Sequence, residues 1–362
     1  MRRLLATTFV LTGLFMAMAA PAFGASQRDH ADCNALDPDR NIVGCTRIIE
    51  DSSERDRIRA IAYVGRGLAW SAKGEGDRAI ADFTAAIALD PTDALAYNNR
   101  GLTWREMGNL DRAIADLTEA IRVNPLPKSD LPGIPHVNIY TNRGLAWLAK
   151  GDLDRAIADF DQAIGLDRDD ADAYNGRGAA WRSKGQLDRA IADFTAAIGT
   201  DPIYVRAYYN RGLVREANAD LASAFVDFSD AIRLDPKFTD AYYSRSQVLL
   251  NKGEIDSAIT DLDEVIRLAP DRADAYYMRG VARYDRYAFA SAWIEQNDLD
   301  RAIADFTQAI RLDPKIAAAY YARALAWNTN GDRDRAVADL TEAVRLEPDN
   351  SQMAAALKQL KP

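Results

Sequence analysis

Side chains able to do nucleophilic, acid–base or metal chemistry are few in this chain of 362 residues. Its two histidines, His30 and His136, stand far apart in sequence, and its two cysteines are Cys33 and Cys45. A histidine-based triad or a zinc site needs several such groups to converge, and no glycine-rich phosphate-binding loop is present. We therefore predict that the protein is not an enzyme and that it uses no metal and no cofactor.

The first 25 residues have the pattern of a signal peptide. Arg2 and Arg3 precede an apolar stretch at residues 4–19, and the Ala-Pro-Ala segment at residues 20–22 is a small-residue processing site. An uncleaved anchor helix is the alternative, although the stretch is slightly short for a membrane span. We expect cleavage by residue 25 and a periplasmic or secreted protein with no membrane span after cleavage.

Export would place the two cysteines in an oxidising compartment, where a disulfide persists. We therefore expect a bridge between Cys33 and Cys45. A reactive thiol or a metal-binding pair is the alternative, but neither a histidine cluster nor a second cysteine pair lies nearby in the sequence.

The formal net charge of the chain is -9 at pH 7. Nucleic-acid binding depends on lysine and arginine side chains that neutralise phosphates. We expect a protein or peptide partner and no nucleic acid.

The sequence repeats with a period of 34 residues, as between Pro91 and Pro125. The repeated elements must position the side chains described above. Two steps are longer and carry insertions, one at residues 128–136 and one at about residues 284–296. The repeats then have approximate spans of 60–93, 94–127, 137–170, 171–204, 205–238, 239–272, 273–316 and 317–350.

Each repeat reads as two helices joined by a tight turn. A tyrosine at the fourth place opens an apolar pattern of helical period, and a glycine such as Gly74 ends the first helix. An aspartate such as Asp77, three residues later, is expected to cap the second helix, which a proline ends. In the fifth repeat Ala219 replaces the glycine and Arg215 stands where four earlier repeats have tryptophan, so we expect it to be the weakest.

The pattern Tyr-x-x-x-Gly, followed by Gly, Ala, Phe, Ala and Pro within 34 residues, resembles the tetratricopeptide repeat. The resemblance covers residues 60–350. It implies an all-α, right-handed superhelical solenoid of about eight helix hairpins, with a concave groove lined by the first helices. Residues 26–59, with both cysteines, would then cap the first repeat, and residues 351–362 would cap the last.

An arginine recurs in every first helix and an aspartate in every second helix. The resemblance places the two inside one hairpin, so we expect eight internal salt bridges. A ladder of arginines for an anionic ligand is the alternative, but the aspartates would neutralise it. The pairs begin with Arg66 and Asp82 and end with Arg323 and Asp339.

Two kinds of side chain occupy the places that the resemblance assigns to the groove. Amides able to hold a peptide backbone dominate the N-terminal half, and tyrosines suited to apolar side chains dominate the C-terminal half. The alternative is that they are solvated residues without a ligand. The candidate contact residues are Asn98, Asn99, Asn142, Asn175, Asn210, Tyr209, Tyr243, Tyr277 and Tyr321.

The second insertion is rich in aromatic residues, among them Tyr284, Tyr287, Phe289 and Trp293. A simple spacer does not require this density, so we expect Tyr287 and Trp293 to contact a partner. The alternative is local packing of a longer helix pair.

These observations predict an exported adaptor or scaffold that binds an extended peptide or a partner protein in its groove. One alternative is a structural solenoid that self-associates, so that a homo-oligomer is possible. Another is a binder of glycans or cell-wall fragments that uses the tyrosines.

Overall fold

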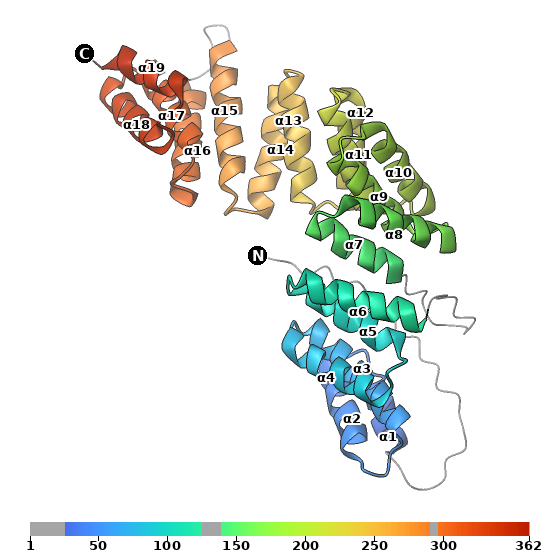
Figure 1. Ribbon diagram of the computed structural model, residues 1–362. Coiled ribbons are helices and arrows are strands. Elements are labelled where there is room, and N and C mark those ends of the chain that lie inside the picture. The colour runs from blue at the N-terminus through green and yellow to red at the C-terminus, as the bar shows by residue number, and fades with distance from the viewer. Residues whose placement is uncertain (1–25, 125–138, 290–295, 362) are drawn as a thin grey trace. The chain divides into compact units, whose positions relative to one another are not determined.

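The computed structural model describes residues 26–124, 139–289 and 296–361 (Figure 1). All secondary structure in these ranges is helical, as nineteen α-helices without a strand. The leader, the insertion at residues 128–136 and Trp293 lie outside the described residues. No helix in the described part of the chain is long and apolar enough to cross a membrane.

The helices fall into two compact units, one that ends at Asp201 and one that begins at Pro202. We call them unit 1 and unit 2. Unit 1 contains α1 Gln27–Cys33, α2 Pro38–Glu50, α3 Asp56–Ala72, α4 Gly76–Leu89, α5 Ala94–Glu106, α6 Leu110–Val123, α7 Ile139–Lys150, α8 Leu153–Leu166, α9 Ala171–Ser183 and α10 Leu187–Thr200. Unit 2 contains α11 Val205–Ala217, α12 Leu221–Leu234, α13 Thr239–Asn251, α14 Ile255–Leu268, α15 Ala273–Phe289, α16 Gln296–Leu312, α17 Ala317–Thr329, α18 Arg333–Leu346 and α19 Ser351–Leu360.

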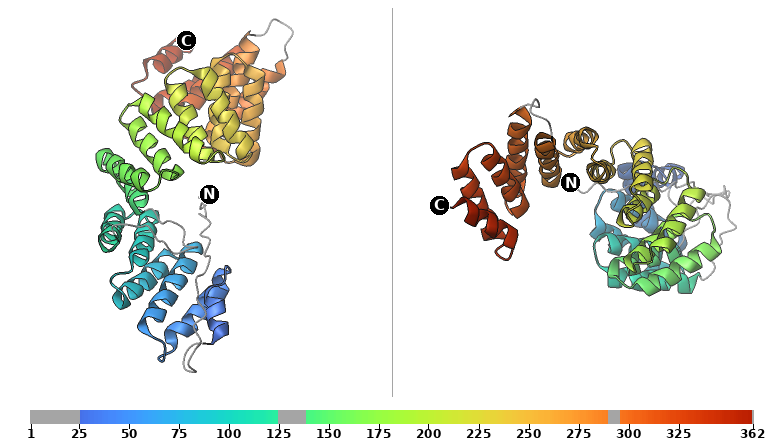
Figure 2. Two further views of the ribbon diagram at one scale, coloured as in Figure 1. Left: turned by 90° about the vertical axis from the view of Figure 1, so that its right-hand side faces the viewer. Right: turned by 90° about the horizontal axis from the view of Figure 1, so that it is seen from above.

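Consecutive helices form hairpins, and within each unit the second helix of a hairpin also contacts the first helix of the next (Figure 2). Small first-helix residues allow this close packing. A Cβ atom at Gly67 would lie 2.6 Å from the ring of Phe83, and one at Gly212 would lie 2.6 Å from the ring of Phe228. Both phenylalanines are fully buried, so in these two hairpins an aromatic ring is pressed against a glycine backbone.

The expected internal ion pairs are present in every hairpin from α3–α4 to α17–α18. Each arginine binds its buried aspartate through Nε and Nη2, with shortest distances of 2.6 to 2.8 Å. The arginine also reaches beyond its own hairpin, because Arg100 Nη1 donates to Thr84 Oγ1 at 3.0 Å and Arg143 Nη1 donates to Thr118 Oγ1 at 3.1 Å. The guanidinium groups therefore join neighbouring hairpins as well as the two helices of one.

The turns between paired helices depart from the expectation in one respect. Asp77 lies in the first turn of α4, and the residue at the N-cap is Glu75. The same shift places Asn109 at the cap of α6, where its side chain accepts a hydrogen bond from the amide of Arg112. The predicted capping aspartates were therefore placed about two residues too late, although a carboxylate in the first turn still favours the positive end of the helix dipole.

Ala219, in the turn of the fifth hairpin, has a φ angle of 60°. Among the described residues it is the only one other than glycine with a positive φ, whereas the corresponding Gly74 has a φ of 76°. The left-handed conformation costs an L-residue about 1 to 2 kcal/mol. We expect Ala219→Gly to raise the free energy of unfolding by up to about 1 kcal/mol, after the larger backbone entropy of glycine is allowed for. Urea unfolding measures the change, and Ala217→Gly, at the last residue of α11, should not raise the stability.

The N-terminal segment folds as a short hairpin of α1 and α2. The expected disulfide joins Cys33 to Cys45, with a Cα–Cα distance of 4.5 Å. Asn41 Nδ2 donates to the carbonyl oxygen of Cys33, and Gly44 lacks the Cβ that would otherwise meet the backbone of α1. The half-length α1 is thus held to α2 by a covalent bond, hydrogen bonding and close contact.

Candidate functional site

The asparagines of unit 1 form a hydrogen-bonded group between α5 and α7. Asn98 and Asn99 are buried, with 0% and 3% of their surface exposed. Asn142 Nδ2 donates to Asn98 Oδ1 at 2.9 Å, and Asn98 Nδ2 approaches Asn99 Oδ1 at 3.4 Å. Asn142 and Asn175 are half-buried. The amides do not form a freely accessible row, because those of Asn98 and Asn142 bind each other, and contact of these residues with a partner stays a prediction.

Two buried donors on α5 have no acceptor among the described residues. They are Asn99 Nδ2 and Arg105 Nη1. Burial lowers the pKa of the Arg105 guanidinium, although the carboxylates of Glu106 and Asp172 act in the opposite direction. Asp172 belongs to α9, which like α5 is the first helix of a hairpin. Arg105 therefore lies on the side of unit 1 that the first helices form. A buried donor without an acceptor is costly, so this side of unit 1 is suited to receive hydrogen-bond acceptors.

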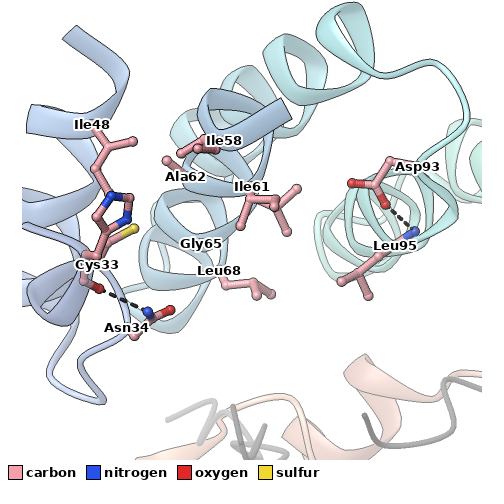
Figure 3. A pocket seen from close by; sticks show the side chains of 12 residues that line it. Cys33, Asn34, Ile48, Ile58, Ile61, Ala62, Gly65, Leu68, Asp93 and Leu95 are labelled. Atoms are coloured by element: carbon pink, nitrogen blue, oxygen red, sulfur yellow. Dashed lines mark hydrogen bonds between the residues drawn. The ribbon is translucent and has the colours of Figure 1, made fainter. Parts of the chain in front are cut away.

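An apolar pocket adjoins the N-terminal end of α5 (Figure 3). Its volume is about 160 Å³, and aliphatic side chains from α2, α3 and α5 dominate its lining. Ile61 is 49% exposed and Leu95 is 40% exposed. Figure 3 shows these two side chains on facing helices, with Leu68 beside Ile61 on α3 and Cys33 on the side away from Leu95.

Sequence reasoning did not identify this pocket or the exposed state of its residues. Ile61 and Leu95 occupy the second place of their repeats, which the resemblance already assigned to the groove. The position of Ile61 and Leu95 in the repeat is the sequence signal that could have identified them as groove residues.

The tyrosines of unit 2 pack between neighbouring helices. Tyr209 contacts the rings of Phe228 and Phe238, at centroid distances of 5.8 and 4.9 Å. Arg272 lies 4.4 Å from the ring centre of Tyr243, and burial raises the pKa of Tyr243 to about 12. Their half-buried rings therefore contribute to hairpin stacking.

The remaining groove candidates of unit 2 are also half-buried. Tyr277 packs near Phe306 at 6.2 Å, and Tyr321 packs against the cluster around Leu340. Asn210 is half-buried on α11. A role of these residues in partner contact stays a prediction.

The structure describes only part of the aromatic insertion. Tyr284 and Tyr287 pack against the core cluster of Leu299 and Phe306, and the hydroxyl groups of Tyr284 and Thr329 are 3.1 Å apart. These contacts favour the alternative of local packing for Tyr284 and Tyr287. Contact of Tyr287 with a partner is not tested by them.

The described residues contain no group of three or more histidine, cysteine, aspartate or glutamate side chains arranged to hold a metal ion.

Comparison with known proteins identifies the repeat. The family described as tetratricopeptide repeat matches residues 64–126, 98–171, 141–202, 182–237, 243–292 and 287–351. No curated protein sequence matches the chain.

Solved structures share the fold. PilF from Pseudomonas aeruginosa is 19% identical, with a TM-score of 0.52, over 64% of this chain and 96% of that chain. YrrB, described as a TPR protein with an unusual peptide-binding site, is 24% identical with a TM-score of 0.47, over 55% of this chain and 97% of its own. MamA is 27% identical with a TM-score of 0.43, over 48% of this chain and 96% of its own.

Proposed function

The chain belongs to the tetratricopeptide repeat family, and on that premise we propose that it is an exported interaction protein that binds an extended segment of a partner protein against the first helices of unit 1. Proteins built from this repeat are generally scaffolds without catalytic activity. The leader and the disulfide support export, because a disulfide persists outside the reducing cytosol.

The observation that carries the proposal is the state of Arg105. The internal arginines of the repeats each bind a buried aspartate, whereas Arg105 Nη1 is buried with no acceptor in the described part of the chain. Hairpin stacking gains nothing from such a group, since a buried polar group without a partner destabilises the fold. An extended segment offers a carbonyl or carboxylate oxygen every few ångströms along its length, and one of these can accept from Arg105.

The Arg105→Gln variant tests this interpretation. We expect recovery of bound partners from the envelope fraction of the source cells to fall about tenfold or more, because hydrogen bonds to charged groups contribute about 1.5 to 3 kcal/mol. The melting temperature should stay the same or rise, because the variant removes a buried charged donor, Nη1, that has no acceptor in the described part of the chain. Quantitative mass spectrometry of the recovered proteins measures the first effect, and calorimetry measures the second.

Arg122→Gln is the matched control. Arg122 is exposed on α6, a second helix, and pairs with Glu119 at 2.5 Å. It should leave partner recovery unchanged. Equal recovery of every partner by Arg105→Gln and the unchanged protein would refute the proposed binding face.

A further inference from the structure

The apolar pocket of unit 1 lies beside the short first helix of the N-terminal hairpin. α1 has 7 residues, whereas α3 has 17 and α5 has 13. At the pocket, Ile61 on α3 is 49% exposed and Leu95 on α5 is 40% exposed. One wall of the pocket, which includes Cys33 and Ile48, comes from α1 and α2. This wall lies before residue 64, where the family match begins, so the repeat pattern does not account for it.

The Cys33–Cys45 disulfide forms part of this wall. Cys33 lines the pocket. A Cβ at Gly65 would lie 3.3 Å from Cys45 Sγ and 3.8 Å from Cys33 Sγ, so the absence of a side chain at Gly65 lets the disulfide approach α3. In α1 only Asp32 and Cys33 are buried. Asn41 and the close contact at Gly44 also hold α1 to α2, and the disulfide is the covalent link that fixes α1 beside the pocket.

We propose that this pocket binds an aliphatic side chain of the partner segment and that the Cys33–Cys45 disulfide is required for that binding. The inference rests on the proposed function and names the chemistry that the partner must supply. Aliphatic side chains dominate the lining, and apolar cavities of about 150 Å³ stay dry and take up benzene-sized groups. A pocket volume of about 160 Å³ therefore suits one side chain of the size of leucine, isoleucine or methionine.

The Asp93 carboxylate disfavours an acidic guest at its side of the pocket. Asp93 lies on the rim of the pocket, where its carboxylate accepts hydrogen bonds from the amides of Leu95 and Ala96 at 2.9 and 3.2 Å. A second carboxylate beside it would meet like-charge repulsion in a partly buried place. The aliphatic guest is thus a neutral side chain, and a fatty acid with its head group at this rim is disfavoured.

The pocket and the proposed binding face share one helix, α5. Leu95 stands near the start of α5 and Arg105 near its end, ten residues later, which is about 15 Å along a helix. An extended peptide spans this distance in about four or five residues. One segment can therefore place an aliphatic side chain in the pocket and an acceptor oxygen at Arg105.

A pair of synthetic peptides tests the pocket. The first is acetyl-Ser-Leu-Ser-Gly-Ser-Asp-Ser-amide, and the second has serine in place of leucine. The purified, oxidised chain is titrated with each, and methyl NMR signals of Ile58, Ile61 and Leu95 report on the pocket. We expect these signals to shift with the leucine peptide, which should bind about 10- to 100-fold more tightly than the serine peptide, because burial of a leucine side chain contributes about 1.5 to 3 kcal/mol.

Two variants distinguish loss of the pocket from loss of the fold. Ile61→Ser keeps the disulfide and should abolish the preference for leucine. The Cys33→Ser, Cys45→Ser double variant should abolish it as well, and circular dichroism verifies that the repeats remain helical. The affinity for the serine peptide should be unchanged in both.

Three results would overturn the proposal. The first is equal binding of the two peptides to the unchanged protein. The second is a leucine preference that survives loss of the disulfide. The third is displacement of the leucine peptide by octanoate, with shifts of the same methyl signals. If both peptides bind equally through Arg105, the pocket is refuted and the proposed function stands. Failure of both peptides to bind at about 10 mM also refutes the pocket, whereas the partner-recovery experiment still decides the proposed function.

Discussion

Replacing Asp227 by alanine is expected to destabilise the α11–α12 hairpin by about 3 to 5 kcal/mol. Asp227 has no exposed surface and receives Arg211 and Arg215, each at 2.8 Å. Without the carboxylate, two guanidinium groups of one hairpin would lose the buried charge that they share. Removal of one partner from a buried ion pair is far more harmful than loss of an exposed pair, because the remaining charge has lost its solvation by water.

Asp230→Ala, on the same helix, is the matched control. Asp230 pairs with Arg233 at 3.1 Å in a largely exposed i,i+3 contact, for which a change of about 0 to 1 kcal/mol is normal. Repeat stability is mainly a sum of local and nearest-neighbour contributions. Amide hydrogen exchange of α11 and α12 in the full chain is therefore the appropriate measurement. A loss below about 1 kcal/mol for Asp227→Ala would contradict the buried-pair interpretation.

The fifth hairpin shows how far sequence alone could lead. Ala219 and Arg215 marked it as irregular, and the structure places Ala219 in a left-handed turn. The sequence did not reveal that Arg215 binds Asp227 as a second arginine. Arg283, in the seventh hairpin, binds Asp305 at 2.7 Å in the same way. An arginine in place of tryptophan therefore changes the internal ion pair, an effect that depends on side-chain reach and not on periodicity.

The internal pairs themselves could be predicted because both partners recur at every repeat. In the seventh hairpin Arg279 and Asp305 are 26 residues apart instead of the 16 between Arg66 and Asp82, since the insertion lies between them. Their contact persists at 2.6 Å. The position within each helix, and not the separation along the chain, determines which residues meet.

The candidate site was less predictable, because it depends on irregular features. Asn98 contacts Asn99 on its own helix and Asn142 on the neighbouring first helix. A repeat pattern does not specify these contacts. The pocket at Ile61 is lined in part by the short α1, which is joined to α2 by a disulfide that approaches Gly65. Such features come from three-dimensional packing between segments whose sequences do not repeat.

Gly176→Ala is expected to lower the free energy of unfolding by about 1 to 3 kcal/mol, because it overpacks a filled contact. A Cβ at Gly176 would lie 2.4 Å from Cζ of Phe160, and one at Gly144 would lie 2.7 Å from Cε1 of the same ring. Phe160 is fully buried and is held between a glycine of its own hairpin and a glycine of the next. Its ring has no free side toward which it can move away from an added methyl group.

Phe160→Leu supplies the rescue that identifies this cause. Other repeats have leucine at the same place, as in Leu117 and Leu262, and leucine lacks the Cζ atom that Gly176 faces. The double variant should be more stable than the sum of the two single changes predicts, by at least about 1 kcal/mol, since residues in contact are coupled. Urea unfolding of the four proteins measures this coupling.

Gly165→Ala provides a control of opposite sign. Gly165 lies on α8, the helix that bears Phe160, and an added Cβ there would meet nothing within 4 Å. Alanine is a better helix former than glycine by about 0.5 to 1 kcal/mol, so this variant should gain stability. If Gly176→Ala gained stability as well, or if Phe160→Leu failed to rescue it, the close approach of the two hairpins at this ring would not be what requires glycine.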